Sequence, residues 1–170
     1  MNRIKKNNIA QSLYSFTPVI LLFISVLNEI DFNYSGLKYF SFNFAYILIF
    51  YYNLKKSEGL GFGLVFIAGL LNDVVIGMPI GLSSLIYLLL CGAASYLRNI
   101  TLRPNLMKDC IFFLMTILTL NSLSFLILTF IFNYELNYLD QVINIIFTFI
   151  FYLIFSYFFN LLEEFIRERS

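Results

Sequence analysis

The stretch Gly69-Leu-Leu-Asn-Asp-Val-Val-Ile-Gly-Met-Pro-Ile-Gly-Leu-Ser-Ser84 decides the fold, because it sets one acid and a series of small residues between two apolar runs. Gly69, Asp73 and Gly77 recur every four residues, so they share one face of a predicted helix. The Gly-Met-Pro sequence that starts at Gly77 is a turn signal, and Pro79 suits the first turn of the next helix. The stretch therefore predicts a helical hairpin.

Small residues continue on the second predicted helix of this hairpin. Gly81, Ser84, Gly92 and Ser95 fall near one of its faces. Membrane helices associate through close packing, which small side chains permit. We therefore expect the hairpin glycines, Gly77 and Gly81 included, to let the two helices approach each other closely.

The composition places these helices in a membrane. The chain has 170 residues, of which 60% are hydrophobic and 12% are charged, and its mean hydropathy is +0.82. An ordinary soluble domain is about 45–50% apolar and about 25% charged. A chain of this size with so little polar surface could not cover a single soluble core. The composition thus excludes a soluble globular domain, a disordered chain and a nucleic-acid binder.

Six apolar runs follow one another along the chain. At roughly 20 residues per span, they predict an all-α polytopic membrane protein with six transmembrane helices in one domain, residues 1–170. The predicted spans are about residues 13–28, 40–54, 60–77, 79–97, 110–132 and 142–162. No small-residue cleavage site follows the first run, so we interpret it as an uncleaved helix rather than a signal peptide.

The basic residues predict the orientation of these spans. Six spans put ten of the 11 basic residues on one side, together with both termini, and leave only Lys38 on the other. Cytoplasmic loops of membrane proteins carry an excess of lysine and arginine. Both termini are therefore predicted to be cytoplasmic.

Asp73 is the one acid inside an apolar run. A carboxylate at the bilayer centre costs roughly 2.5–3.5 kcal/mol on insertion scales. Three interpretations are open: it accepts hydrogen bonds from the start of the next helix, it contacts a partner helix, or it binds a ligand or relays protons. We expect no second buried acid on another helix, because the others, Asp109 included, fall in predicted loops or tails. Four of these acids are expected to be solvated in loops: Glu29, Asp31, Glu135 and Asp140.

Signatures of enzyme chemistry are missing from the sequence. The chain has no histidine, which is the commonest general base and metal ligand. Its two cysteines, Cys91 and Cys110, stand alone in or beside apolar runs, so we interpret them as small apolar filler. A lone carboxylate cannot perform paired acid–base chemistry. We predict a non-enzyme without a metal or cofactor.

The hairpin stretch also resembles a family signature. Gly69-Leu70-Leu71-x-Asp73-x-x-x-Gly77-x-Pro79-x-Gly81-Leu82 is similar to the signature of the rod shape-determining protein MreD family. The segment Tyr51-Tyr52-Asn53-Leu54-Lys55-Lys56 resembles the end of that family's second helix, where an aromatic residue often stands at the Asn53 position. The Arg-Pro pair often found before that helix is replaced here by Gly36-Leu37-Lys38.

The resemblance implies a non-enzymatic scaffold of the bacterial cell-elongation machinery in the inner membrane. Proteins of this family associate with the single-pass protein MreC, and with it the actin-like MreB, the glycosyltransferase RodA and a penicillin-binding transpeptidase. Their fold resembles the substrate-binding subunits of energy-coupling-factor vitamin transporters. The helix-packing or partner-binding positions would then be Gly69, Asp73, Gly77, Pro79, Gly81 and Ser84.

That fold suggests a rival function, namely a transport subunit that captures a small molecule. Such subunits typically carry an Ala-x-x-x-Ala pattern on their first helix, whereas Thr17–Ser25 reads TPVILLFIS. A third class, a lipid-processing enzyme or flippase, is favoured only by Asp73. The partner-binding face, and whether the cleft holds a lipid or a small molecule, stay open at this point.

Overall fold

The computed structural model describes residues 17–27, 42–55, 60–101, 105–135 and 137–169, with side chains described as far as residue 162. These residues form helices and no strand, which confirms the all-α prediction. A helix at Thr17–Leu27 comes first. It is followed by α2 (Phe44–Lys55), α3 (Phe62–Ile76), α4 (Leu82–Ile100), α5 (Leu106–Phe130) and α6 (Tyr138–Arg169). Lys38, Glu29 and Asp31 lie outside the described residues.

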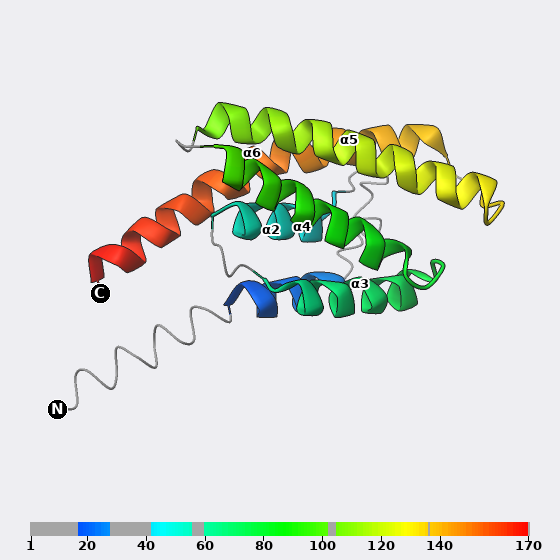
Figure 1. Ribbon diagram of the computed structural model, residues 1–170, viewed down its shortest axis with the longest axis horizontal. Helices are drawn as coiled ribbons and strands as arrows, with labels where there is room; N and C mark the ends of the chain where they lie inside the picture. Colours follow the sequence, from blue (N-terminus) through cyan, green and yellow to red (C-terminus); the bar gives the residue numbers. More distant parts are fainter. Residues whose placement is uncertain (1–16, 28–41, 56–59, 102–104, 136, 170) are drawn as a thin grey trace, which may run out of the picture.

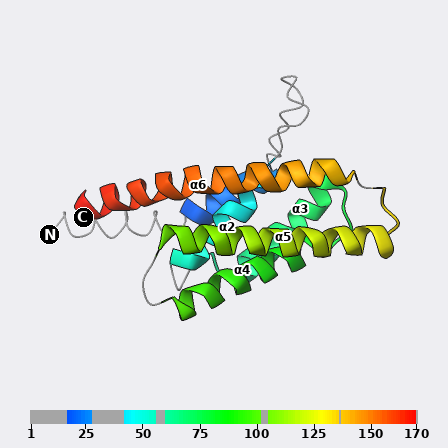
Figure 2. The same cartoon turned by 90° about the horizontal axis from the view of Figure 1, so that it is seen from above.

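The helices extend along the long axis of the molecule, which is horizontal in Figure 1. The α3–α4 turn and the α5–α6 turn lie at one end, and the carboxyl terminus of α6 lies at the other (Figure 1). Helix α4 is central to the packing, because it contacts α2, α3 and α5. Seen from above, α5 and α6 extend side by side along the length of the molecule (Figure 2).

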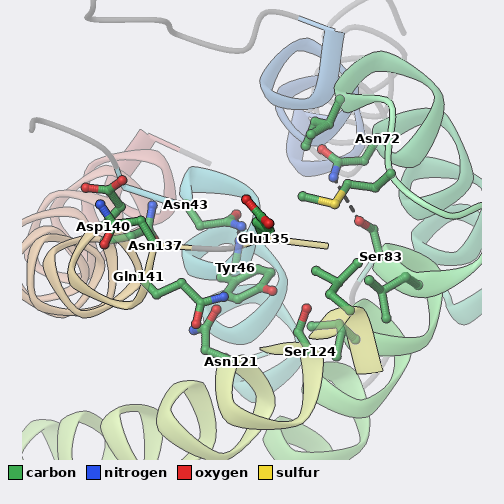
Figure 3. Close-up of a pocket in the computed structure, with 16 residues that line it drawn as sticks. Asn43, Tyr46, Asn72, Ser83, Asn121, Ser124, Glu135, Asn137, Asp140 and Gln141 are labelled. Atoms are coloured by element: carbon green, nitrogen blue, oxygen red, sulfur yellow. Dashed lines mark hydrogen bonds between the residues drawn. The ribbon is translucent and has the colours of Figure 1, made fainter. Parts of the chain in front are cut away.

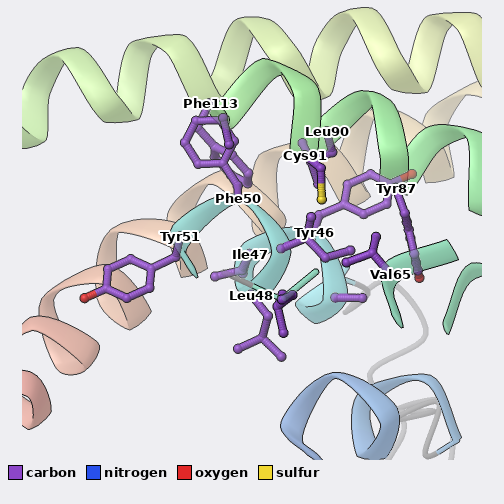
Figure 4. Packing of buried hydrophobic residues seen from close by; sticks show 14 of the residues in the cluster. Tyr46, Ile47, Leu48, Phe50, Tyr51, Val65, Tyr87, Leu90, Cys91 and Phe113 are labelled. Atoms are coloured by element: carbon purple, nitrogen blue, oxygen red, sulfur yellow. The ribbon is translucent and has the colours of Figure 1, made fainter. Parts of the chain in front are cut away.

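Helix α2 lies in the middle of the core. Its sequence FAYILIFYYNLK is apolar on every side, as expected of a helix that is surrounded by others. The side chains from Ile47 to Tyr51 are fully buried (Figure 4). Phe113 of α5 packs on Phe50 at a ring distance of 4.9 Å and stacks on Tyr152 of α6 at 4.1 Å. Aromatic side chains thus join α2, α5 and α6.

Side-chain caps extend α5 and α6 beyond the predicted spans. Helix α5 begins at Leu106, whereas the predicted span begins at residue 110, because the Asn105 side chain accepts a hydrogen bond from the Met107 N–H at 3.0 Å. Helix α6 begins at Tyr138 rather than at residue 142, and the Asn137 side chain accepts from the Leu139 N–H at 3.1 Å. Polar residues assigned to loops by hydropathy therefore belong to the first turns of helices.

Two helices, α5 and α6, contain segments that are long and apolar enough to cross a membrane. Only 28% of the apolar segment of α5 and 22% of that of α6 is buried within the molecule. The core helix of a soluble protein would be mostly buried instead. Most of the apolar surface of these two segments is thus left uncovered within the molecule.

Candidate functional site

The Asp73 carboxylate caps the start of α4 from the neighbouring helix. Asp73 is 0% exposed near the end of α3. Its two oxygens accept hydrogen bonds from the backbone N–H of Gly81 at 2.7 Å and of Ser83 at 2.9 Å. The first N–H groups of a helix have no partner within that helix, and they carry a partial positive charge. The carboxylate satisfies two of these groups and fixes the angle at which α4 leaves the turn.

The backbone of the same residue ends α3. The Asp73 carbonyl accepts hydrogen bonds from the N–H of Gly77 and, at 2.9 Å, from the N–H of Met78. Gly77 has φ 74°, the left-handed conformation that commonly closes a helix. One residue therefore organises both sides of the turn, its carbonyl by ending α3 and its carboxylate by starting α4.

Close packing within the hairpin occurs at Gly69. A Cβ atom added to Gly69 would collide with the backbone of Ser84, so only glycine fits there. The Ser84 hydroxyl donates a hydrogen bond of 2.9 Å to the Phe66 carbonyl of α3. These two positions form the seam between α3 and α4.

The expectation that Gly77 and Gly81 also permit close approach is wrong. A Cβ atom at either position would meet nothing within 4 Å. Their φ angles of 74° and 99° show a different requirement, because side chains other than glycine rarely adopt this backbone conformation. The sequence pattern alone could not distinguish a glycine required for close packing from one required for a left-handed backbone conformation.

Pro79 does not lie in the first turn of α4 as predicted. The helix begins at Leu82, and Pro79 precedes it in the turn, where its carbonyl accepts from the Leu82 N–H at 3.2 Å. The left-handed Gly81 separates the two and delays the start of the helix. Pro79 therefore stiffens the turn rather than the helix.

The three interpretations of Asp73 can be compared with this geometry. Both oxygens accept backbone N–H groups, and the side chain has no exposed surface. A partner helix, a ligand or a proton carrier would reach the carboxylate only after the hairpin opened. The observed arrangement is the one that the hydrogen-bond acceptor interpretation requires.

A second buried acid does exist, contrary to expectation. Asp109 lies in the first turn of α5 and is 4% exposed. It interacts electrostatically with Lys55 of α2 and Tyr152 of α6. Hydropathy had assigned Asp109 to a loop, and only the packing of α5 against its neighbours covers it. Because Asp73 lies at the other end of the bundle, the two carboxylates do not form a catalytic pair.

A cavity of about 510 Å³ opens beside the hairpin, at the end of the bundle that holds the α3–α4 and α5–α6 turns. We call it the polar cavity. Six side-chain amides line it: Asn43, Asn72, Asn121, Asn137, Gln141 and Asn144. Other polar groups that line it are Tyr46, Ser83, Ser124, Glu135 and Asp140 (Figure 3). Its remaining walls are apolar and come from α3, α4, α5 and the α3–α4 turn.

Some of the amides are held in place by the fold. The Asn72 amide donates to the Ser83 hydroxyl at 3.0 Å, as the dashed line in Figure 3 shows. Asn43 caps α2 by accepting from the Tyr46 N–H at 3.1 Å, and its own N–H donates to Thr148 of α6 at 2.9 Å. The polar cavity thus has a rigid rim on the α2 and α3–α4 sides.

Sequence reasoning missed the polar cavity. Asn121 and Asn144 stand as isolated amides within long apolar runs, more than twenty residues apart. Each is a weak signal, because a single amide can bond to its own helix, as Asn121 does with the Ile117 carbonyl at 2.9 Å. Only the packing of α2, α5 and α6 brings them to one space.

Neither the polar cavity nor the hairpin offers a metal centre. Among the side chains that the structure describes, no three carboxylate or thiol groups come together in a way that could hold a metal ion. Both cysteines are buried and free, and the Cys91 sulfur accepts a hydrogen bond from the Asn53 amide at 3.2 Å. Comparison with protein-family models, with curated proteins and with solved structures found no match for the chain.

Proposed function

We propose that the chain is a non-enzymatic scaffold of the bacterial cell-elongation complex, similar to MreD. In this proposal it crosses the inner membrane six times, has both termini in the cytoplasm and folds like the substrate-binding subunits of energy-coupling-factor transporters. It binds an MreC-like single-pass protein through its helices. It thereby helps to link MreB, RodA and a penicillin-binding transpeptidase to peptidoglycan synthesis.

The uncovered apolar surface of α5 and α6 gives the proposal its main support. Ile111 and Met115 of α5 are each 60% exposed, and Ile150 and Ile154 of α6 are also exposed. Clusters of exposed apolar residues commonly mark a surface that binds a membrane or another protein. Lipid and the transmembrane helix of a partner are the two kinds of surface that can cover it without desolvating polar groups.

Depletion in a rod-shaped host tests the cellular part of the proposal. Cells that lose the protein are expected to round up, because the scaffold no longer couples the filament to wall synthesis. Purification in mild detergent should retrieve an MreC-like partner together with the chain. Depleted cells that keep their shape would contradict the proposal.

Tryptophan scanning tests where the partner binds. Ile111, Met115, Ile150 and Ile154 are each replaced by tryptophan, which keeps the surface apolar but adds bulk. At least one substitution should abolish co-purification at normal protein abundance. Ile24→Trp, at an exposed position of the first helix, is the matched control. Full co-purification of all four variants would remove α5 and α6 as the docking surface.

The polar cavity favours a second candidate, a membrane subunit that captures a small molecule for transport. Ligand sites commonly lie between the helices of a bundle and combine apolar walls with a few polar groups. The depletion experiment separates the two functions. Loss of uptake of a vitamin in cells of normal shape would favour the transport subunit.

A further inference from the structure

We propose that the polar cavity binds a small, water-soluble, hydroxyl-rich molecule of about the size of a sugar, and that it prefers a cationic or uncharged molecule to an anion. The inference goes beyond the scaffold function, because a scaffold needs no ligand. It rests on the geometry of the polar cavity and would hold for either candidate function.

The size and place of the polar cavity fit such a molecule. Its volume of about 510 Å³ falls within the range of roughly 300–1,000 Å³ that small-molecule sites occupy. In a chain that is 60% hydrophobic, six amides line this one space. Each is partly exposed or exposed, so it can meet water or a polar ligand.

Several side chains in the polar cavity have hydrogen-bonding capacity to spare. The side chains of Ser124 and Gln141 and the Tyr46 hydroxyl make no hydrogen bond to another described residue. Figure 3 shows Tyr46, Asn121 and Gln141 around the same space. An amide donates and accepts hydrogen bonds at the same time, as a hydroxyl does. Side chains of this kind suit a ligand with several hydroxyl groups better than one with apolar surface.

Charge sets the preference between ligands. Glu135 and Asp140 line the polar cavity and are exposed, and no lysine or arginine is among the described residues that line it. Lys55 and Arg98 lie at the carboxyl ends of α2 and α4, at the opposite end of the bundle. A pocket lined by negatively charged carboxylates attracts cations and repels anions.

Calorimetric titration of the full chain tests the proposal. The protein is reconstituted in phosphatidylcholine nanodiscs, because a detergent with a sugar head would compete for the site. Glucosamine, glucose and glucuronate share one skeleton and carry a positive, no and a negative charge. We expect glucosamine to bind at least as tightly as glucose, and glucuronate to bind about tenfold more weakly than glucosamine or not at all.

Variants connect the binding to the polar cavity. Gln141→Leu removes the hydrogen-bonding capacity of that side chain and should weaken glucosamine and glucose binding by about tenfold. The pair Glu135→Gln and Asp140→Asn should abolish the preference for glucosamine over glucuronate. Asn99→Leu, at an exposed position of α4 away from the polar cavity, is the matched control and should bind like the wild type.

Four results would overturn the proposal. The first three are that none of the three sugars binds, that glucuronate binds most tightly, and that Gln141→Leu binds the sugars like the wild type. The fourth is that only glucosyl diacylglycerol in the nanodisc stabilises the protein, which would assign the site to a lipid head group. The titration uses purified protein and is independent of cell shape. Failure of this inference can therefore be distinguished from failure of the scaffold function.

Discussion

Asp73 shows at the scale of one residue how an acid can reside in an apolar hairpin. Its carboxylate accepts the N–H groups of Gly81 and Ser83, which the start of α4 would otherwise leave unpaired. The partial positive charge at the amino end of a helix favours a negative group there. These interactions offset the cost of placing the charge away from water.

Substitutions of Asp73 should destabilise the protein in a graded way. Asp73→Asn keeps one acceptor oxygen but turns an amino group towards one of the two N–H donors. We expect the free energy of unfolding to fall by about 1–2 kcal/mol for Asp73→Asn and by about 3 kcal/mol for Asp73→Ala, which leaves both donors unpaired. Thermal melting of the purified protein in detergent measures both effects.

Glu135→Gln is the matched control, because it removes one negative charge at an exposed position. This variant should melt like the wild type. Co-purification with the MreC-like partner is measured on the same samples. Wild-type melting of Asp73→Asn together with lost co-purification would contradict the structural role. Asp73 would then be a contact residue.

Gly69→Ala should also destabilise the hairpin, for a steric reason. The added Cβ would collide with the Ser84 backbone, so α3 and α4 must move apart. Overpacking of this kind typically costs about 1–3 kcal/mol. Gly63→Ala on the same helix adds its Cβ to open space and should be neutral or slightly stabilising. Equal melting temperatures for the two variants would contradict the close contact at Gly69.

At the scale of elements, the Asn105 and Asn137 caps set where α5 and α6 begin. The apolar composition of the two helices gives them exposed apolar faces. Cysteine labelling tests whether α6 crosses the bilayer. In a background with Cys91→Ser and Cys110→Ser, Ile150→Cys should resist a water-soluble maleimide in intact vesicles, because its surroundings are apolar. Asn137→Cys, in the α5–α6 turn, should react when the maleimide is on the same side of the vesicle membrane as that turn. Prompt labelling of Ile150→Cys would show that this face meets water.

The sequence predicted the elements better than it predicted their contacts. Apolar runs and the Gly-Met-Pro turn located α3 and α4 to within a few residues. Asp109 was misplaced, because a hydropathy pattern treats every charge as a boundary, whereas the Asn105 cap draws that charge into a helix. The polar cavity could not be predicted, since its amides come from α3, α5, α6, the α5–α6 turn and the residue that precedes α2.

At the scale of the whole molecule, Lys55 and Arg98 lie at the opposite end of the bundle from the exposed acids Glu135 and Asp140. Arg98 donates a hydrogen bond of 2.8 Å to the Asn53 carbonyl, and the Lys55 ammonium lies 6.0 Å from the centre of the Tyr51 ring. Both pairs are at the carboxyl ends of α2 and α4. The acids Glu135 and Asp140 are at the end with the two turns. This separation suits a protein that has one end in the cytoplasm.

Reporter fusions test this orientation. Alkaline phosphatase fused at Asn137 should be active, because the α5–α6 turn is predicted to be periplasmic. The same enzyme fused at Ser170 should be inactive, and a cytoplasmic fluorescent reporter there should be bright. Phosphatase activity from the Ser170 fusion would refute the six-span arrangement.

The Asp73 cap has a consequence for how the protein is made. The carboxylate reaches its two donors across only eight and ten residues of chain. Its hydrogen bonds can therefore form soon after Ser83 leaves the ribosome, before α5 and α6 can pack against the hairpin. A helix pair that satisfies the carboxylate in this way presents no unpaired acid to apolar surroundings, and a carboxylate at the bilayer centre costs roughly 2.5–3.5 kcal/mol. We therefore expect the hairpin to form as a unit during synthesis, before the later helices pack against it.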